Sequence, residues 1–377
     1  MPGGDRNKKR QEEEEEVKKS FVHLPYDLTE HCLAITPRRH YPNLSLASKS
    51  FRRILRSPEL YQRRSTLGVT EPVLYASVGF PPSETPSWHT LHRDHFSLRL
   101  RKIASLPSRL LTAVAAVGTE MYVLGGSVGG NPTSDVNLID CRFHTSRSLP
   151  RMKRARSRAV AGAIDGKVYV IGWCRKKSDD WVEVFDVKTQ AWRDMPAVLP
   201  RAHWEGQFFV TCAVMDDKIF VLDPSATCLV FDPRVGALVE WDDGVEMRSL
   251  WQASSCVVDD MLYTVDPGCS LKHPIVVYDP KAEDRRWRPV YGVDLKKDLP
   301  PFDSWYDSKM ANHGGKLVVL LGSNPWPCFH HGRQDVWCVE IALVRQGDDI
   351  WGHVESTTLV LTSRKWPSIE LSRSVTL

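Results

Sequence analysis

The stretch GTEMYVLGG, residues 118–126, decides the fold of this 377-residue chain, because variants of it recur along the sequence. The variants are VLYASVG (73–79), DGKVYVIG (165–172), DDKIFVLD (216–223), DDMLYTVD (259–266) and GGKLVVLLG (314–322). Aligned with one another, they repeat one aromatic or apolar anchor residue at intervals of 47, 47, 51, 43 and 55 residues. The anchors are Tyr75, Tyr122, Tyr169, Phe220, Tyr263 and Val318. Self-similarity at such a period indicates a repeat architecture.

A second pattern follows the anchor in several units: a β run that ends in Asp, then a turn, then Trp. It is clearest in VEVFDVKTQAW, LVFDPRVGALVEW and IVVYDPKAEDRRW, which end at Trp192, Trp241 and Trp287. Asp followed by Pro or by polar residues suits a turn between antiparallel strands. The last unit is stretched and reaches Trp351. Each unit therefore predicts about four short strands in about 50 residues.

This period predicts an all-β propeller, because a four-stranded blade has two apolar faces that only neighbouring blades can cover. The anchors and the later Trp residues are then inter-blade packing residues rather than ligand-stacking aromatics. Six anchors predict six blades. Residues 353–377 or 70–80 would complete one blade, so that strands from both chain ends close the ring and remove its exposed edges.

The residues before the repeats have a different character. Residues 1–20 carry six Lys or Arg and six Asp or Glu, which predicts a disordered charged tail. The basic cluster at 6–10 leaves a nuclear-import signal open. No apolar run approaches the ~20 residues of a membrane span, and because the first residues hold no apolar segment we expect no secretory signal there. Nine Cys without a CxxC pair fit reduced thiols, so we expect a cytoplasmic or nuclear protein without membrane partners.

Residues 21–68 predict three short helices instead of strands. Leu28, Cys32 and Ile35 are spaced by 4 and 3, which places them on one helical face. A second amphipathic helix follows from 44 to 55, and Ser57-Pro58 predicts the start of a third. So small a module cannot bury much core alone, and we expect it to finish its core against something else. Its net charge of +5 suggests an acidic partner, although a solvated basic face explains the charge equally well.

Two parts of the chain resemble known families. The anchors, the later Trp residues and Gly125-Gly126 are similar to kelch repeats over roughly residues 70–360, although the other units have lost one or both glycines. Leu24-Pro25, LSLASKSFRRIL and the following SPELYQRRSTLG resemble an F-box. An F-box followed by kelch repeats is the layout of the plant F-box/kelch-repeat family. The resemblance implies a tail at 1–20, an F-box at 21–68 and a kelch-repeat propeller at 69–377.

The resemblance also implies that the F-box docks on a Skp-type adaptor, which links it to a cullin scaffold and a ubiquitin-conjugating enzyme. The docking positions carried over to this chain are Leu24, Pro25, Leu28, Ile35, Leu44, Leu46 and Phe51. Cys32 and Ala47 stand where the family often has a larger aliphatic residue, which would weaken the contact. The chain would then be the substrate-recognition subunit of an SCF-type E3 ubiquitin ligase. The alternatives are a kelch scaffold or a small-molecule propeller enzyme outside any ligase, or a helical cap on the propeller.

The sequence offers little catalytic chemistry. It contains no GxSxG, HExxH or P-loop motif. Its Asp residues lie mainly in predicted turns, where Asp is favoured by local hydrogen bonding. His89, His92 and His95 are spaced by three, which leaves a metal site open as an alternative. We therefore expect no catalytic residue, no metal and no cofactor.

The predicted substrate-binding face of the propeller is built from the loops that lead into the innermost strands. Positions twelve and thirteen residues before the anchors carry Arg and aromatic residues, which are enriched at protein interfaces. The predicted contacts are Arg109, Arg156, Trp251, Trp305 and Tyr306. The alternative is that Arg156 and its equivalents form hydrogen bonds between blades. The basic run at 152–158 could suggest nucleic acid, but residues 69–377 sum to −1, so we expect no nucleic-acid partner.

Overall fold

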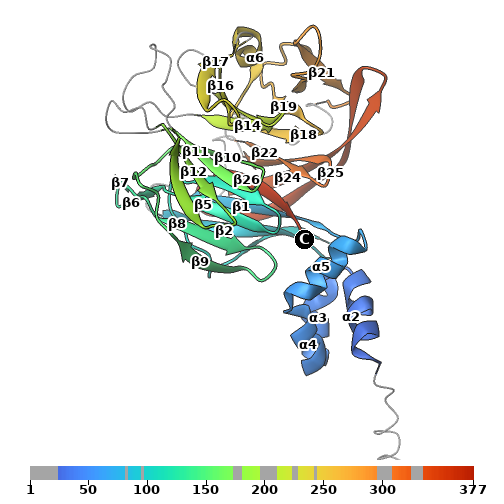
Figure 1. Ribbon diagram of the computed structural model, residues 1–377. Helices are drawn as coiled ribbons and strands as arrows, with labels where there is room; N and C mark the ends of the chain where they lie inside the picture. The colour runs from blue at the N-terminus through green and yellow to red at the C-terminus, as the bar shows by residue number, and fades with distance from the viewer. Residues whose placement is uncertain are drawn as a thin grey trace, which may run out of the picture. The chain divides into compact units, whose positions relative to one another are not determined.

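The computed structural model describes residues 24–80, 84–94, 97–172, 181–195, 210–222, 228–241, 244–294, 308–323 and 334–377 (Figure 1). The chain divides into two compact units, Met1–Thr70 and Glu71–Leu377. The charged tail predicted at 1–20 lies outside the described residues. In the described ranges, none of the helices is both long and apolar enough to cross a membrane.

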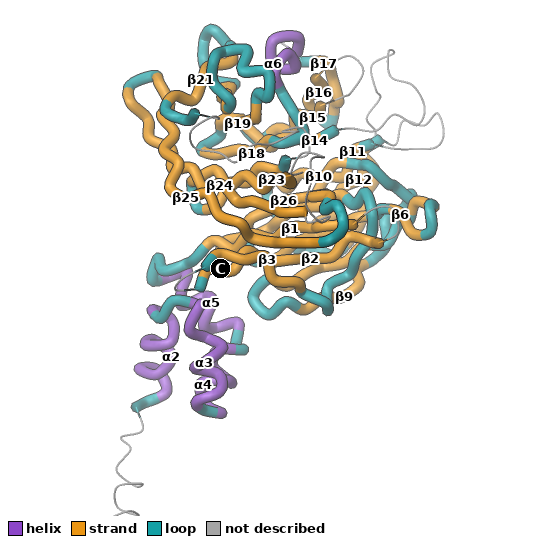
Figure 2. The backbone as a smooth tube through the Cα atoms, turned by 180° about the vertical axis from the view of Figure 1, so that it is seen from behind, coloured by secondary structure: helices purple, strands orange, loops and turns teal. Residues whose placement is uncertain are grey.

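The first unit is helical. Its elements are α2 (Tyr26–Ile35), the 3-10 turn η1 (Arg38–His40), α3 (Tyr41–Ala47), α4 (Lys49–Leu55) and α5 (Pro58–Thr66), drawn in purple in Figure 2. The single helix predicted from 44 to 55 is wrong, because extended backbone at Ser48 divides it into α3 and α4. The Ser48 hydroxyl accepts the Ser50 N–H at 3.1 Å and so caps α4. Ser57 caps α5 in the same way, with Pro58 in its first turn, as predicted.

The core of this unit is small and contains a buried cation. The apolar core residues are Leu33, Ala34, Tyr41, Ile54, Leu55, Leu60 and Tyr61. Arg64 of α5 is only 1% exposed. Its guanidinium donates to the carbonyls of Ala34 at 2.6 Å and Val69 at 2.6 Å and to the Tyr41 hydroxyl at 3.0 Å. Arg64 therefore ties the end of α2, the start of α3 and the chain after α5 to one point.

The second unit consists of antiparallel sheets. Four are separate four-stranded sheets, and one has eight strands, in a propeller-like arrangement (Figure 1). The first four-stranded sheet contains, in order, β26 (Ser368–Thr376), β1 (Pro72–Phe80), β2 (Glu84–Arg93) and β3 (Leu98–Lys102), and the second contains β4 (Ala113–Val117), β5 (Glu120–Leu124), β8 (Val136–Asp140) and β9 (Thr145–Leu149). The third contains β10 (Val160–Ile164), β11 (Lys167–Ile171), β12 (Val182–Asp186) and β13 (Ala191–Met195). The fourth contains β14 (Thr211–Met215), β15 (Lys218–Leu222), β16 (Cys228–Asp232) and β17 (Ala237–Glu240). A short ribbon pairs β6 (Ser127–Val128) with β7 (Asn131–Pro132).

The eight-stranded sheet combines two meanders. One contains β18 (Ser255–Val258), β19 (Met261–Val265), β20 (Ile275–Tyr278) and β21 (Trp287–Tyr291); the other contains β22 (Lys309–His313), β23 (Lys316–Ser323), β24 (Gln334–Gln346) and β25 (Asp349–Ser363). A short parallel contact between β21 and β25 joins them. The short helix α6 (Gly244–Leu250) precedes the first meander.

Every predicted anchor lies on the second strand of its four-stranded unit and is buried. The anchor rings reach the next sheet: Tyr122 contacts Phe185, and Tyr169 contacts Phe231, with ring centroids 6.0 and 5.6 Å apart. The later Trp residues pack on an aromatic ring of their own sheet, as Trp192 does on Phe185 at 5.0 Å. The apolar core therefore lies between sheets, as the period predicts.

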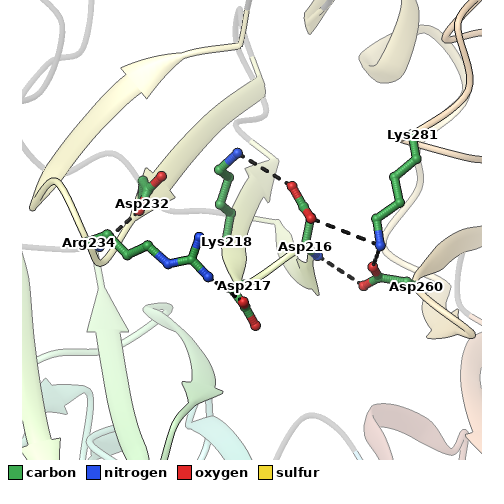
Figure 3. A network of polar contacts seen from close by, with 7 residues as sticks. All are labelled: Asp216, Asp217, Lys218, Asp232, Arg234, Asp260 and Lys281. Carbon is green, nitrogen blue, oxygen red and sulfur yellow. Dashed lines mark hydrogen bonds and ion pairs between the residues drawn. The ribbon is translucent and has the colours of Figure 1, made fainter.

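The turn acids have a backbone role and a surface role. Asp216, Asp217 and Asp260 adopt positive φ in the two-residue turns that join the first and second strands, a geometry that tight hairpins require. Their side chains lie among three cations (Figure 3). Asp217 pairs with Arg234 at 2.5 Å, and Lys281 pairs with Asp260. Because these pairs are exposed, each adds little stability, and the acids need no catalytic explanation.

The Gly125-Gly126 pair is required by close packing against two loops. Gly125 has φ +60°, and a Cβ there would lie 2.4 Å from the Arg156 carbonyl oxygen. Gly126 has φ +100°, and its Cβ would lie 2.6 Å from Thr112 Cγ2. The Gly126 N–H donates to the Arg156 carbonyl at 2.8 Å, which links the second sheet to the loop before β10.

Gly125→Ala is therefore expected to destabilise the propeller by about 3 kcal/mol or more, because it combines left-handed backbone strain with a clash against backbone. Gly118→Ala is the matched control, since Gly118 has φ +56° and nothing within 4 Å of its Cβ. We expect a cost of about 1 kcal/mol for the control. Urea denaturation measures both values, and equal losses would contradict the packing argument.

The two ends of the propeller meet in one sheet. β26 pairs with β1 from Pro72↔Thr376 to Gly79↔Ser368, and Figure 1 shows red β26 beside β1. This confirms that strands from both chain ends share a sheet. Two side-chain contacts join this sheet to the eight-stranded sheet at a junction between the two. Arg93 of β2 pairs with Glu340 of β24, and the ring of His313 in β22 lies 3.2 Å from the hydroxyl of Ser374 in β26.

This junction should weaken in acid. Burial lowers the pKa of His313 below its ordinary value, so the unfolded chain binds more protons and stability is lost as the pH falls below about 6.5. Burial alone would raise the pKa of Glu340, but hydrogen bonds from Arg93 and Ser356 lower it overall, so its contribution disappears only at lower pH. We expect urea midpoints to fall between pH 7 and 5.5 and His313→Asn to flatten that slope. An unchanged slope would show that His313 is not the group responsible.

Candidate functional site

The first unit exposes several large apolar side chains. Leu28 and Ile35 of α2 are 51% and 52% exposed, and Leu46 of α3 is 77% exposed. Leu24 and Tyr26, at the start of α2, are also exposed. The buried residues of α2 are Leu33 and Ala34, so Leu28 and Ile35 of the same helix lie outside its inward face. Such a concentration on a small unit is typical of a protein-interaction surface.

A pocket of about 420 Å³ adjoins this surface. It is lined by Cys32, Leu33, Thr36, His40, Asn43, Leu44 and Phe51. Leu44 and Phe51 are half-buried, and both line the pocket. Most of the pocket wall is apolar, so an apolar side chain of a partner would fit it. The pocket and the exposed side chains together are called the docking surface below.

All seven predicted docking residues lie in the described part of this unit. Leu24, Pro25, Leu28, Ile35 and Leu46 are exposed, whereas Leu44 and Phe51 line the pocket. Two further residues of this unit were not predicted from the sequence: Tyr26, which is 48% exposed, and Arg64, which is buried and bonds to three parts of the unit. Tyr26 carried no signal because it lies outside the apolar spacing of α2. Arg64 carried none because a buried Arg and an exposed Arg look alike in a sequence.

The surroundings of the docking surface are basic. The exposed cations of this unit include Arg39, Lys49, Arg52, Arg53 and Arg56. Residues 24–70 contain only three acids, and one of them, Glu30, lies 3.6 Å from Arg63. The positive field would attract an acidic partner and speed its association.

On the propeller, the side chain of Arg109 is anchored within its own sheet. It donates to the Gly125 carbonyl and to Asn137 Oδ1, both at 2.7 Å. Two longer bonds, of 3.3 Å, reach the carbonyls of Val123 and Asp135. Burial lowers the pKa of Arg109. Arg109 still borders a pocket near the start of β4, so part of its surface faces solvent.

Arg156 is buried, with 1% of its surface exposed. Its guanidinium pairs with Glu183 of β12 at 3.0 Å and donates to the carbonyls of Gly172 and Trp181. These side-chain bonds stay within one sheet, while the backbone of Arg156 bonds to Thr133 of the preceding sheet. In this conformation the Arg156 side chain is too buried to contact a target protein, so we do not propose it as a contact residue.

Trp251 is also buried. It is 2% exposed, and its indole N–H donates to the Ser255 hydroxyl at 2.9 Å. Trp251 packs in the core between two sheets together with Met247 of α6. Its position therefore supports the sheets and presents no surface to a substrate. Trp305 and Tyr306 lie outside the described residues.

The histidine spacing noted in the sequence does not produce a shared face. His89 and His92 lie on β2, where residues three apart point to opposite sides of the sheet. The ring of His89 contacts the Ser87 carbonyl, and that of His92 contacts Asp94. His95 lies outside the described residues. Within the described ranges, no three His, Cys, Asp or Glu side chains are grouped as a metal site would need.

Comparisons with known proteins agree with both units. Residues 84–361 match the FKB95 kelch-repeats domain, and residues 21–63 match the F-box domain. The chain is 47% identical over 382 residues to F-box/kelch-repeat protein At2g29830 of Arabidopsis thaliana, covering 99% of this chain and 97% of that protein. It is 44% identical to Kelch repeat-containing protein At1g19460 of Arabidopsis thaliana, covering 94% of this chain and 86% of the relative. It is 45% identical to F-box/LRR-repeat/kelch-repeat protein At2g29770 of the same plant, covering 94% and 91%.

Proposed function

Because this chain belongs to the F-box/kelch-repeat family of plant proteins, we propose that it is the substrate-recognition subunit of an SCF-type ubiquitin ligase. The observation that carries the proposal is the docking surface. Leu28, Ile35 and Leu46 leave more than half of their surface in water, although a free-standing helical unit would gain stability by covering them. A Skp-type adaptor, itself linked to a cullin scaffold, would cover these side chains.

The proposed division of labour assigns no bond chemistry to this chain. The F-box holds the adaptor, and the propeller holds a target protein. Holding both raises the effective concentration of the target near the ubiquitin carrier, which accelerates transfer without a catalytic residue in this subunit. We place this activity in the cytoplasm or nucleus, where such ligases and reduced thiols coexist.

We also propose that the propeller has six blades. Four are the separate four-stranded sheets, and the eight-stranded sheet counts as two. The supporting feature is the contact between its halves, which consists of the register pairs Val290↔Ile350 and Tyr291↔Trp351 alone. A core cluster that includes Tyr263 of β19 and Leu317 of β23 packs between the two halves. Similar clusters pack between the separate sheets.

Reconstitution tests the ligase role. The full chain is mixed with a recombinant plant Skp1-type adaptor and passed over a size-exclusion column, with a chain starting at residue 69 as control. We expect the full chain to elute with the adaptor and the control to elute alone. Elution of the full chain without the adaptor would instead favour a kelch scaffold outside any ligase.

A further inference from the structure

The innermost strands of the propeller form a ring. They contact one another in a closed cycle, in the order β26, β4, β10, β14, β18 and β22. Inner strands arranged in this way surround a central channel. In this cycle neither β14 nor β18 is a neighbour of β26, so both lie across the channel from it.

A pocket of about 310 Å³ lies at one end of these strands and is called the mouth pocket below. Its lining includes Val210, which directly precedes β14, and Leu371 of β26. Residues two apart in a strand point to the same side, about 7 Å from each other. Cys212 of β14 and Arg373 of β26 therefore form the next layer of the channel, behind the mouth pocket.

The side chain of Arg373 lies in the channel. It is half-buried, as are the thiols of Cys212 in β14 and Cys256 in β18. Burial raises the pKa of both thiols, and the positive charge of Arg373 offsets part of that rise. Because one guanidinium acts on two strands across the ring from its own, it lies between the channel walls and not within the packing of two neighbouring sheets.

The guanidinium of Arg373 has few acceptors. Its Nη1 donates to the Ser372 carbonyl at 3.1 Å, and the described part of the chain offers it no second acceptor. The enclosed Arg109 differs, because it donates to four acceptors. The thiols do not balance the charge, since burial keeps Cys212 and Cys256 protonated at neutral pH. Arg373 thus brings one positive charge into the channel without a carboxylate beside it.

An enclosed charge of this kind favours an anion as its partner, because an unpaired ion loses hydration energy when it is enclosed. The planar fork of a guanidinium fits two oxygens of one phosphate group. A phosphate group also carries nearly two negative charges near neutral pH, more than a carboxylate does. It is small enough to pass through the mouth pocket.

We propose that the central channel binds a phosphate group on Arg373, one layer behind the mouth pocket. The group is either free inorganic phosphate or the phosphate of a phosphoserine side chain that enters through the mouth pocket. The inference does not depend on the ligase role, because adaptor binding concerns the helical unit.

Calorimetric titration of the full chain with inorganic phosphate tests the inference. We compare the parent chain with Arg373→Gln, which keeps a hydrogen-bond donor and removes the charge. The variant should bind phosphate about 10-fold more weakly, the usual effect of one charge-assisted contact. Arg286→Gln is the matched control, since it removes the same charge from an exposed position of the propeller and should leave the affinity unchanged. Equal affinity of the parent and Arg373→Gln would overturn the inference.

Urea denaturation supplies a second readout. Phosphate stabilises most proteins by exclusion from their surface, so the three chains share that effect at matched ionic strength. The parent and Arg286→Gln should show an additional rise of the urea midpoint, which Arg373→Gln lacks. Without phosphate, Arg373→Gln should be at least as stable as the parent, because it removes an unpaired charge. A lower midpoint of this variant in phosphate-free buffer would show that the protein itself stabilises the guanidinium, which contradicts the inference.

A short peptide distinguishes the two sources of the phosphate group. It is N-acetyl-Ala-phosphoserine-Ala amide, compared with its unphosphorylated counterpart. Binding of the phosphopeptide that is lost in Arg373→Gln would assign the site to a phosphorylated side chain of a target. Binding of inorganic phosphate without binding of the phosphopeptide would assign it to the free anion. If neither binds in a way that depends on Arg373, the inference is refuted.

Discussion

Replacing both Leu28 and Leu46 by Asp should weaken binding of a Skp1-type adaptor by about 100-fold or more and leave the stability of the isolated chain unchanged. Both side chains are mostly in water in the free chain, at 51% and 77% exposure, so the substitution removes few internal contacts. In the complex, a carboxylate would instead be buried against apolar surface, and each such central contact contributes about 2 kcal/mol or more. Calorimetric titration measures the affinity, and thermal unfolding measures the stability.

Val235→Asp is the matched control for this experiment, since Val235 is an equally exposed apolar residue, at 74%, on the propeller. It should change neither affinity nor stability. Full adaptor binding by the double variant would show that the docking surface serves another purpose. Polar substitution of Phe51 is less informative, because Phe51 is half-buried and its loss could disturb folding itself.

Glu183→Ala should cost about 3–5 kcal/mol of folding free energy. Glu183 and Arg156 both have 0% exposed side chains, so the substitution leaves a buried guanidinium without its carboxylate. It also removes the acceptor of the Lys153 N–H, which lies 2.7 Å from Glu183 Oε2. Against a typical total of about 5–15 kcal/mol, such a loss would be evident in urea denaturation.

The double substitution Arg156→Met with Glu183→Met supplies the internal check. Replacing both charges by apolar groups of similar volume should cost much less than Glu183→Ala alone, because no buried charge remains unpaired. If the single substitution costs less than about 1 kcal/mol, the site is hydrated and the burial argument is incorrect. The same reasoning applies to tests of target binding. If an Arg156→Ala chain bound its target weakly, the cause would be lost stability and not a lost contact with the target.

The repeat of the anchors made the sheets predictable, for a physical reason. A residue such as Tyr169 has to fill the same gap between sheets in every unit, so its spacing records the architecture. Leu28, Ile35 and Leu46 were predicted as docking positions from the resemblance to an F-box, whose domain matches residues 21–63, and their docking role stays a prediction. Their exposure itself needed the structure, since helical spacing alone also fits a buried face.

The propeller contacts were harder to predict, because a count of residues places a side chain on a loop but gives no direction. Arg156 and Trp251 lie at the counted positions, yet both point inward and are buried. Arg158, two residues beyond Arg156, is exposed and lines a pocket of about 310 Å³. What decides the difference is a left-handed backbone at Leu111 and Arg158, which no pattern of residue types signals.

The pairing of β26 with β1 also bears on the biosynthesis of the protein. Residues 368–376 leave the ribosome after every other described strand of the propeller, so the first sheet lacks β26 until the other sheets have been synthesised. Leu377 is 1% exposed and its carbonyl accepts the Glu71 N–H at 2.7 Å, so the contact with the first strand continues beyond β26. A nonsense allele that stops shortly before Ser368 would therefore yield a chain whose first sheet lacks β26, and cellular quality control would remove that chain although every other strand of the propeller had been translated.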